Sequence, residues 1–176
     1  MRRTSLCILM LLLVACPRPE KSGEPVKPTT TVMSPEQAEA ARQALVEWFE
    51  CEECEEGQLE AVAKYGERVV PSLRAALLEG ASPATEELLR RDLAARYDEL
   101  RRYSESHPNA KVASSKEEFV AMYVGNLHAQ YRTRAAQALS RIGGPSAVRA
   151  LEEGLARADR SDVRGSIEAA LKTAKR

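Results

Sequence analysis

The most specific candidate for chemistry in this sequence is the pair Cys51 and Cys54, which encloses Glu52 and Glu53. A Cys-x-x-Cys pair can form a local disulfide, remain as free thiols, or take part in redox or metal chemistry. Residues three apart on a helix have α-carbons roughly 5 Å apart, within the range that a disulfide allows. An oxidising compartment favours a structural disulfide, and free thiols or a redox or metal role stay open as alternatives.

The surroundings of this pair disfavour catalysis of the thioredoxin type. Such enzymes place the pair at the start of a helix, where the helix dipole stabilises a thiolate. Here the pair follows a helical pattern that carries Trp48, and it lies in a glutamate-rich stretch that disfavours a thiolate. A zinc site would need two further ligands, and the two histidines, His107 and His128, are distant in sequence. We therefore expect no metal and no other cofactor.

Charged residues are unevenly distributed along the chain. Residues 36–60 hold nine glutamates and one arginine, whereas residues 128–176 hold ten Lys or Arg and five Asp or Glu. The acidic stretch lacks the spacing of a calcium loop, so a solvated helix face is favoured over a docking patch. Four arginines of the basic stretch could line a ridge that binds an acidic partner, or they could be solvated and paired within the molecule. These candidates are Arg132, Arg134, Arg141 and Arg149.

The N-terminus carries three consecutive features of a secretion signal. Arg2 and Arg3 are followed by nine apolar residues at 6–14, too few for a bilayer span of roughly 20 residues. The sequence Leu-Val-Ala-Cys then ends at Cys16. This arrangement resembles the signal of bacterial lipoproteins. The resemblance implies a signal peptide over residues 1–15, lipidation of Cys16 and, since Pro17 replaces the aspartate of inner-membrane retention, an outer-membrane location facing the periplasm. An ordinary cleaved signal or a short apolar helix is the alternative.

After Cys16 the composition predicts a tether and then an all-helical domain. Residues 16–33 contain four prolines and few apolar side chains, which is typical of a disordered segment. Residues 34–176 show helical spacing of apolar side chains and no alternation with period two, so we expect an all-α fold. Helix starts are predicted at Ser34, Ser82 and Ser115, the first and last with capping boxes. Four tyrosines at helical spacing are predicted to lie in the core, with Leu100 on the same face: Tyr97, Tyr103, Tyr123 and Tyr131.

Two stretches of the helical domain are internally similar. Residues 131–139 match residues 163–171 at an offset of 32, and residues 59–78 can be aligned with 136–155. A period near 30 with a helix, a glycine turn and a helix is typical of a solenoid. The run from Arg132 to Leu151, with paired alanines, Ile-Gly and Pro, resembles the short HEAT-like repeats first named for phycobilisome lyases. The resemblance implies an α-α superhelix that mostly serves as a protein-binding scaffold. Residues 83–130 depart from the pattern, and we expect a long helical hairpin inserted there.

Composition further narrows the range of functions that the chain can have. Basic and acidic residues both number 26, and this zero net charge argues against a nucleic-acid binder that works by bulk charge. The resulting hypothesis is a membrane-anchored lipoprotein that is not an enzyme and acts as an adaptor or scaffold for an unknown envelope protein, with no small-molecule substrate. The main alternative is a thiol-disulfide redox protein that uses Cys51 and Cys54. A polysaccharide binder is disfavoured by the single tryptophan.

Overall fold

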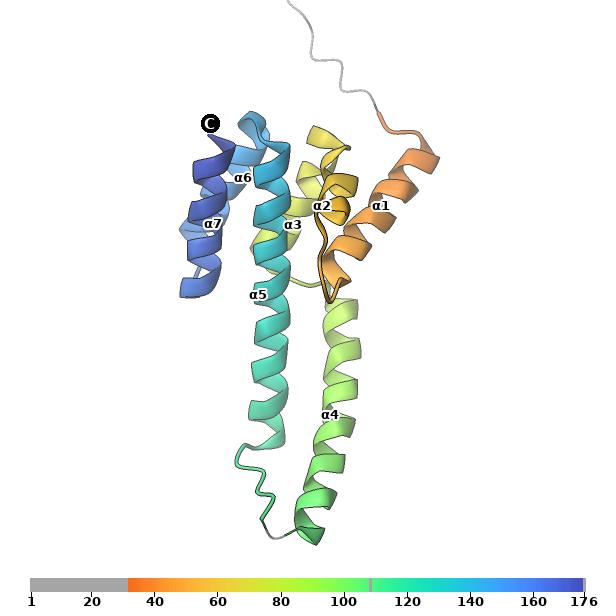
Figure 1. The fold of residues 1–176 in the computed structure, drawn as a ribbon, viewed down its shortest axis with the longest axis vertical. Helices are drawn as coiled ribbons and strands as arrows, with labels where there is room; N and C mark the ends of the chain where they lie inside the picture. The colour runs from red at the N-terminus through yellow and green to blue at the C-terminus, as the bar shows by residue number, and fades with distance from the viewer. Residues whose placement is uncertain (1–31, 108, 176) are drawn as a thin grey trace, which may run out of the picture. The chain divides into compact units, whose positions relative to one another are not determined.

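The computed structural model describes residues 32–107 and 109–175, and within them the chain forms seven α-helices and one 3₁₀ helix with no β-strand (Figure 1). The predicted all-α class is therefore confirmed. The predicted signal peptide over residues 1–15, the lipidation candidate Cys16 and residues 17–31 of the tether lie outside the described residues. None of the described helices has the length and apolar character needed to cross a membrane. All the buried core residues belong to a single unit, Met33–Arg176.

The helices divide into a short-helix body and a long hairpin. The hairpin consists of α4 (Pro83–Ser106) and the first half of α5 (Lys116–Ile142), which extend side by side away from the body (Figure 1). The second half of α5 runs through the body and contacts helices that precede and follow it. The remaining elements are α1 (Pro35–Glu50), α2 (Glu56–Ala63), the 3₁₀ helix η1 (Gly66–Val69), α3 (Val70–Glu79), α6 (Gly144–Arg157) and α7 (Ser161–Ala174).

Local sequence signals account for most helix boundaries. Ser34 and Ser115 cap α1 and α5 with reciprocal capping boxes, and the Ser82 hydroxyl accepts the Thr85 N–H at 3.2 Å. The start of α7 has no such side-chain cap. Arg160 occupies the cap position without a side-chain bond there, and Asp162 instead accepts the N–H of Val163 at 2.9 Å.

The main core is centred on the second half of α5. Its alanines, including Ala135, Ala136 and Ala138, are fully buried and allow neighbouring helices to approach closely. Leu139 fills the space beside them and is also fully buried. The helices α3 and α6 also approach closely, since a β-carbon on Gly154 would lie 2.5 Å from Cδ2 of Leu77. The core therefore depends on small side chains as much as on large ones.

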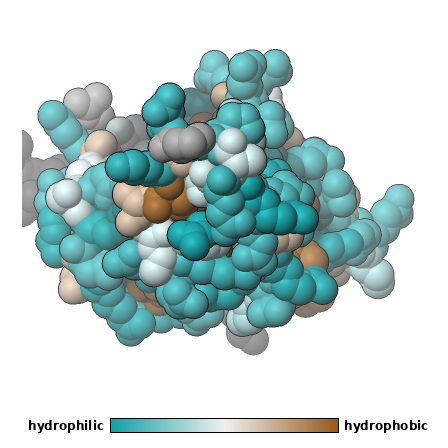
Figure 2. All heavy atoms as spheres, turned by 90° about the horizontal axis from the view of Figure 1, so that it is seen from below, coloured by the Kyte–Doolittle hydropathy of each residue, from teal (hydrophilic) through white to brown (hydrophobic). Residues whose placement is uncertain are grey.

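The hairpin has only a small core of its own. It consists of Leu93, Val120 and Val124, with Leu89 and Phe119 packed against them. Two helices share one interface, so the apolar face of each helix is only partly covered. Viewed from the hairpin end, the molecule is largely hydrophilic with a few hydrophobic patches (Figure 2).

The prediction of core positions for three hairpin residues is wrong. Tyr103 is 55% exposed, Leu100 is 44% exposed and Tyr123 is 42% exposed. Helical spacing places them on the inner faces, but no third helix of the described chain covers those faces. Tyr97 and Tyr131 are buried as predicted, because the opposite helix or the body covers them.

Candidate functional site

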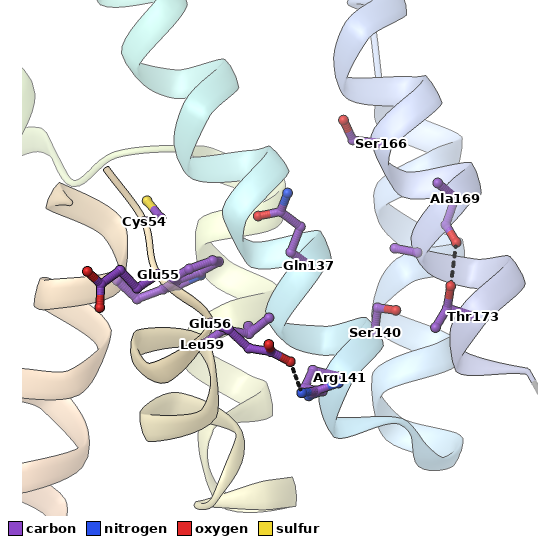
Figure 3. A pocket seen from close by; sticks show the side chains of 12 residues that line it. Cys54, Glu55, Glu56, Leu59, Gln137, Ser140, Arg141, Ser166, Ala169 and Thr173 are labelled. Atoms are coloured by element: carbon purple, nitrogen blue, oxygen red, sulfur yellow. Dashed lines mark hydrogen bonds and ion pairs between the residues drawn. The ribbon is translucent and has the colours of Figure 1, made fainter. Parts of the chain in front are cut away.

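The surface is hollowed between α5, α7 and the loop that joins α1 to α2 (Figure 3). This cavity encloses about 850 Å³. The loop contributes Cys54 and Glu55, and α7 contributes small side chains such as Ala169 and Ser166. Gln137 projects from α5 toward the loop that carries Cys54 (Figure 3). The site therefore combines a helical floor with a loop wall.

A second cavity of about 440 Å³ continues the first along α5, because both are lined by Cys54 and Gln137. We call the two together the α5 groove. One face of α5 supplies uncharged hydrogen-bonding side chains to it at alternating spacings of four and three residues. This polar stripe consists of Asn126, Gln130, Thr133, Gln137 and Ser140.

The polar stripe keeps much of its hydrogen-bonding capacity free. Asn126 accepts a hydrogen bond from Arg160 at 3.1 Å. Among the described residues, by contrast, no side-chain partner bonds to the amide of Gln137 or to the hydroxyls of Thr133 and Ser140. Amides offer both donors and acceptors, as hydroxyls do. The groove can therefore bind a ligand that presents alternating donors and acceptors.

The loop wall is held by a covalent bond and by a half-buried cation. Cys51 and Cys54 form a disulfide, with their α-carbons 5.3 Å apart. The Arg134 guanidinium donates to the carbonyl of Phe49 at 2.5 Å and to that of Cys51 at 2.6 Å, and so satisfies two carbonyls at the end of α1. Burial lowers the pKa of Arg134. These bonds hold the groove wall in one position relative to α5.

The end of α1 is also anchored directly on α5. Trp48 is 4% exposed, and its indole N–H donates to the Arg134 carbonyl at 3.0 Å. The Phe49 ring stacks on Tyr131 with their centroids 4.7 Å apart. Trp48 therefore lines the groove with only the small exposed part of its side chain, while most of its ring packs in the core.

The charged groups of the groove neutralise one another. Arg141 on α5 contacts Glu60 and donates to Glu56 at 2.8 Å (Figure 3). The hydrogen bond that Arg141 donates to Glu60 raises the pKa of Arg141. Part of the acidic stretch of the sequence is thus paired with part of the basic stretch, and the lining of the two cavities together has three carboxylates and three guanidinium groups.

The four arginines singled out in the sequence contact different elements. Arg134 and Arg141 line the α5 groove. Arg132 donates to the carbonyl of Leu78 and to Asp159, both at 3.2 Å. Arg149 lies on α6, and its one side-chain hydrogen bond among the described residues is to Ser146 in the same helix, at 3.2 Å. Three of the four bond to elements other than their own helix, mostly to parts of the chain far away in sequence.

The polar stripe was missed by the reasoning from sequence, although a signal for it exists. Its members recur every three or four residues between 126 and 140, and so share one face of the helix. A search for periodic uncharged polar residues would have found it. The sequence alone does not show that a loop much earlier in the chain forms the opposite wall.

His128 has a packing position. Its Nδ1 accepts the N–H of Ala81 at 3.1 Å, and its Nε2 lies 3.2 Å from a carboxylate oxygen of Glu86. This arrangement ties α5 to the first turn of α4. The histidine therefore fixes the base of the hairpin.

Searches of family models, of curated proteins and of solved structures found no match. The resemblances to lipoprotein signals and to HEAT-like repeats accordingly stay predictions.

Proposed function

We propose that this chain is a lipid-anchored envelope protein that acts as a non-enzymatic adaptor or assembly scaffold, and that the α5 groove binds an extended segment of a partner protein. The observation that carries this proposal is the polar stripe. A peptide backbone in extended form presents N–H and C=O groups in alternation, and uncharged amides and hydroxyls are suited to both. Because the acidic and basic side chains of the groove balance one another, the groove does not favour a strongly acidic or a strongly basic ligand.

Two further observations support a protein ligand over a polysaccharide. Trp48, the single tryptophan, is buried and its N–H is occupied, so it has no open ring face for a sugar. The short HEAT-like repeats that residues 131–173 resemble mostly form protein-binding scaffolds. Both observations favour a polypeptide in the groove.

The proposed anchor would restrict the adaptor to a membrane surface. Each buried methylene contributes about 0.8 kcal/mol, so one acyl chain binds marginally and several bind firmly. A lipidated Cys16 would hold the domain near the outer membrane through the tether. The partner is then expected among proteins of the same envelope compartment.

Photo-crosslinking in the native envelope tests the proposal. A photoreactive amino acid at position 137 of the full-length chain should give a specific adduct with one partner, and Gln137→Arg should reduce recovery of that partner at least tenfold. Gln43 is an exposed glutamine on α1 outside the groove, so Gln43→Arg provides a matched control that should leave recovery unchanged. Equal recovery with both variants, or no specific adduct, would refute the proposal.

A thiol-disulfide redox role is retained as the second candidate because Cys54 is exposed and lines the groove. Two observations oppose it. Cys51 lies at the C-terminal cap of α1, where the helix dipole disfavours a thiolate, and glutamates flank the pair. An insulin-reduction assay distinguishes the candidates, since the adaptor should show no turnover.

A further inference from the structure

The hairpin carries a second concave surface, which shares no lining residue with the α5 groove. It encloses about 640 Å³ between α4 and α5. We call it the hairpin patch, and it is lined by Arg96, Glu99, Leu100, Tyr103, Phe119 and Tyr123. Figure 1 shows that this part of the chain extends beyond the body, and α4 packs mainly against α5 there.

Exposed apolar side chains are concentrated on this hairpin. Of the large hydrophobic residues that are exposed in the described part of the chain, all but Val32 lie on α4 or α5: Leu88, Leu100, Tyr103, Met122 and Tyr123. Scattered apolar side chains are normal on a surface, whereas a cluster around a concave site marks an interface. The hairpin patch is therefore the best candidate for a contact between proteins.

The spacing of the patch residues suits another pair of helices. On α4 the patch residues stand at positions i, i+3, i+4 and i+7, and on α5 at i and i+4. These are the positions that face a neighbouring helix in helix bundles. A two-helix hairpin is half of a four-helix bundle, and a second hairpin would complete it.

The patch is self-complementary about a two-fold axis. The rings of Tyr97 and Phe119 lie 5.6 Å apart, so these residues are level with each other on the two antiparallel helices. From that level the patch extends roughly 9 Å along α4 to Tyr103 and, in the opposite direction, roughly 6 Å along α5 to Tyr123. A two-fold axis near this level would bring Tyr103 of one copy to within roughly 3 Å of the level of Tyr123 of the other along the bundle.

The same axis pairs the charges of the patch. Arg96 and Glu99 flank the middle of the patch, and neither has an ion-pair partner among the described residues, whereas the nearby Asp98 pairs with Lys116 at 2.7 Å. In a two-fold interface residue i of one copy meets residue j of the other, and the reverse also holds. Arg96 of each copy would then face Glu99 of the other copy, which gives two equivalent contacts. An anionic membrane or a strongly charged partner would be better matched by charges of one sign.

We propose that the chain self-associates through the hairpin patch, and that two antiparallel hairpins form a four-helix bundle with the two bodies at opposite ends. The inference stands independently of the α5 groove. The patch is small for a stable interface, so a weak dimer that forms at high local concentration is expected. Each dimer would carry two grooves, and binding of a bivalent partner would gain from that arrangement.

Co-recovery of two full-length chains with different epitope tags tests the proposal. Copies extracted together in mild detergent should be recovered on one tag, and Tyr103→Glu should lower that recovery at least tenfold. Leu88→Glu makes the same kind of change on the same helix outside the patch, and it should have no effect. Because Tyr103 is exposed, its variant should keep the circular dichroism and thermal midpoint of the parent, which separates lost association from lost folding.

Charge exchange provides the sharper test of two-fold symmetry. Arg96→Glu brings two carboxylates together at both symmetry-related contacts, and Glu99→Arg brings two guanidinium groups together there, so neither variant should self-associate. Mixed together, the two variants form two attractive pairs and should recover to near the parent level. Failure of the mixture to recover, no self-association of the parent, or loss of a different protein with Tyr103→Glu would overturn the proposal.

Discussion

Gly80 and His128 lie so close that a β-carbon on Gly80 would fall 2.3 Å from Nδ1 of the histidine. Gly80 ends α3 with φ of 86°, a backbone conformation that other residues adopt only at a cost. The histidine accepts the N–H of Ala81, the next residue. One contact thus sets both the turn between α3 and α4 and the direction in which the hairpin leaves the body.

Substitution Gly80→Ala should destabilise the folded unit by about 2 kcal/mol or more, because positive φ and steric overlap both oppose the new methyl group. Urea unfolding of residues 33–176 measures the change. Gly57→Ala is the matched control, since a β-carbon at this position in α2 meets nothing within 4 Å. It should stabilise the helix by about 0.5–1 kcal/mol. Equal effects at the two positions would contradict the contact.

The arginines of the basic segment should differ in their contribution to stability. Arg134→Met removes two charge-assisted hydrogen bonds to the end of α1 and leaves those carbonyls unsatisfied, which should cost about 2–3 kcal/mol. Arg149→Met should change stability by less than about 0.5 kcal/mol, because this side chain bonds only within its own helix. Urea midpoints of the two variants measure the difference, and a ranking in the opposite order would disprove the assigned role of Arg134.

Removal of the disulfide should affect stability more than binding. The bridge closes a loop with a sequence separation of 3, for which chain entropy predicts a stabilisation of about 2 kcal/mol. A Cys51→Ser, Cys54→Ser double variant should lose that amount and keep partner crosslinking at position 137 within twofold. Complete loss of partner capture in a folded double variant would favour the thiol-disulfide alternative.

Stability should fall in acid. The hydrogen bonds from Arg74 lower the pKa of Glu153, and those from Arg160 lower the pKa of Asp162. A carboxylate with a depressed pKa in the folded state contributes stability above its unfolded pKa of about 4, and this contribution is lost as pH falls through the folded pKa. Unfolding free energies should therefore be steady from pH 7 to about 5 and decline below about 4.

The Arg74→Met variant provides the check on this assignment. Without the guanidinium, the pKa of Glu153 should return toward its ordinary range, and the decline of stability in acid should become less steep. Carboxyl titration by nuclear magnetic resonance follows Glu153 directly. An unchanged acid slope in the variant would mean that other groups cause the decline.

The helices and their boundaries could be predicted because their causes are local. Ser34 and Ser115 bond to residues three positions later, and Gly143 allows the chain to leave α5 without reference to any distant residue. The apolar spacing from Phe119 to Ile142 likewise indicated one long helix, which the structure contains as α5. The sequence alone also singled out the Cys51 and Cys54 pair, although the structure places it in the loop after α1 and not within a helix.

Contacts between distant segments were decided only by the tertiary structure. Helical periodicity tells which side chains share a face, but it does not tell whether another helix covers that face. Tyr97 and Tyr103 therefore look alike in sequence, yet one is 7% exposed and the other 55% exposed. The partners of Arg134 lie 83 and 85 residues away, and the α5 groove exists because the loop after α1 folds beside α5. Burial and binding surfaces depend on which elements meet, and that is a property of the whole chain.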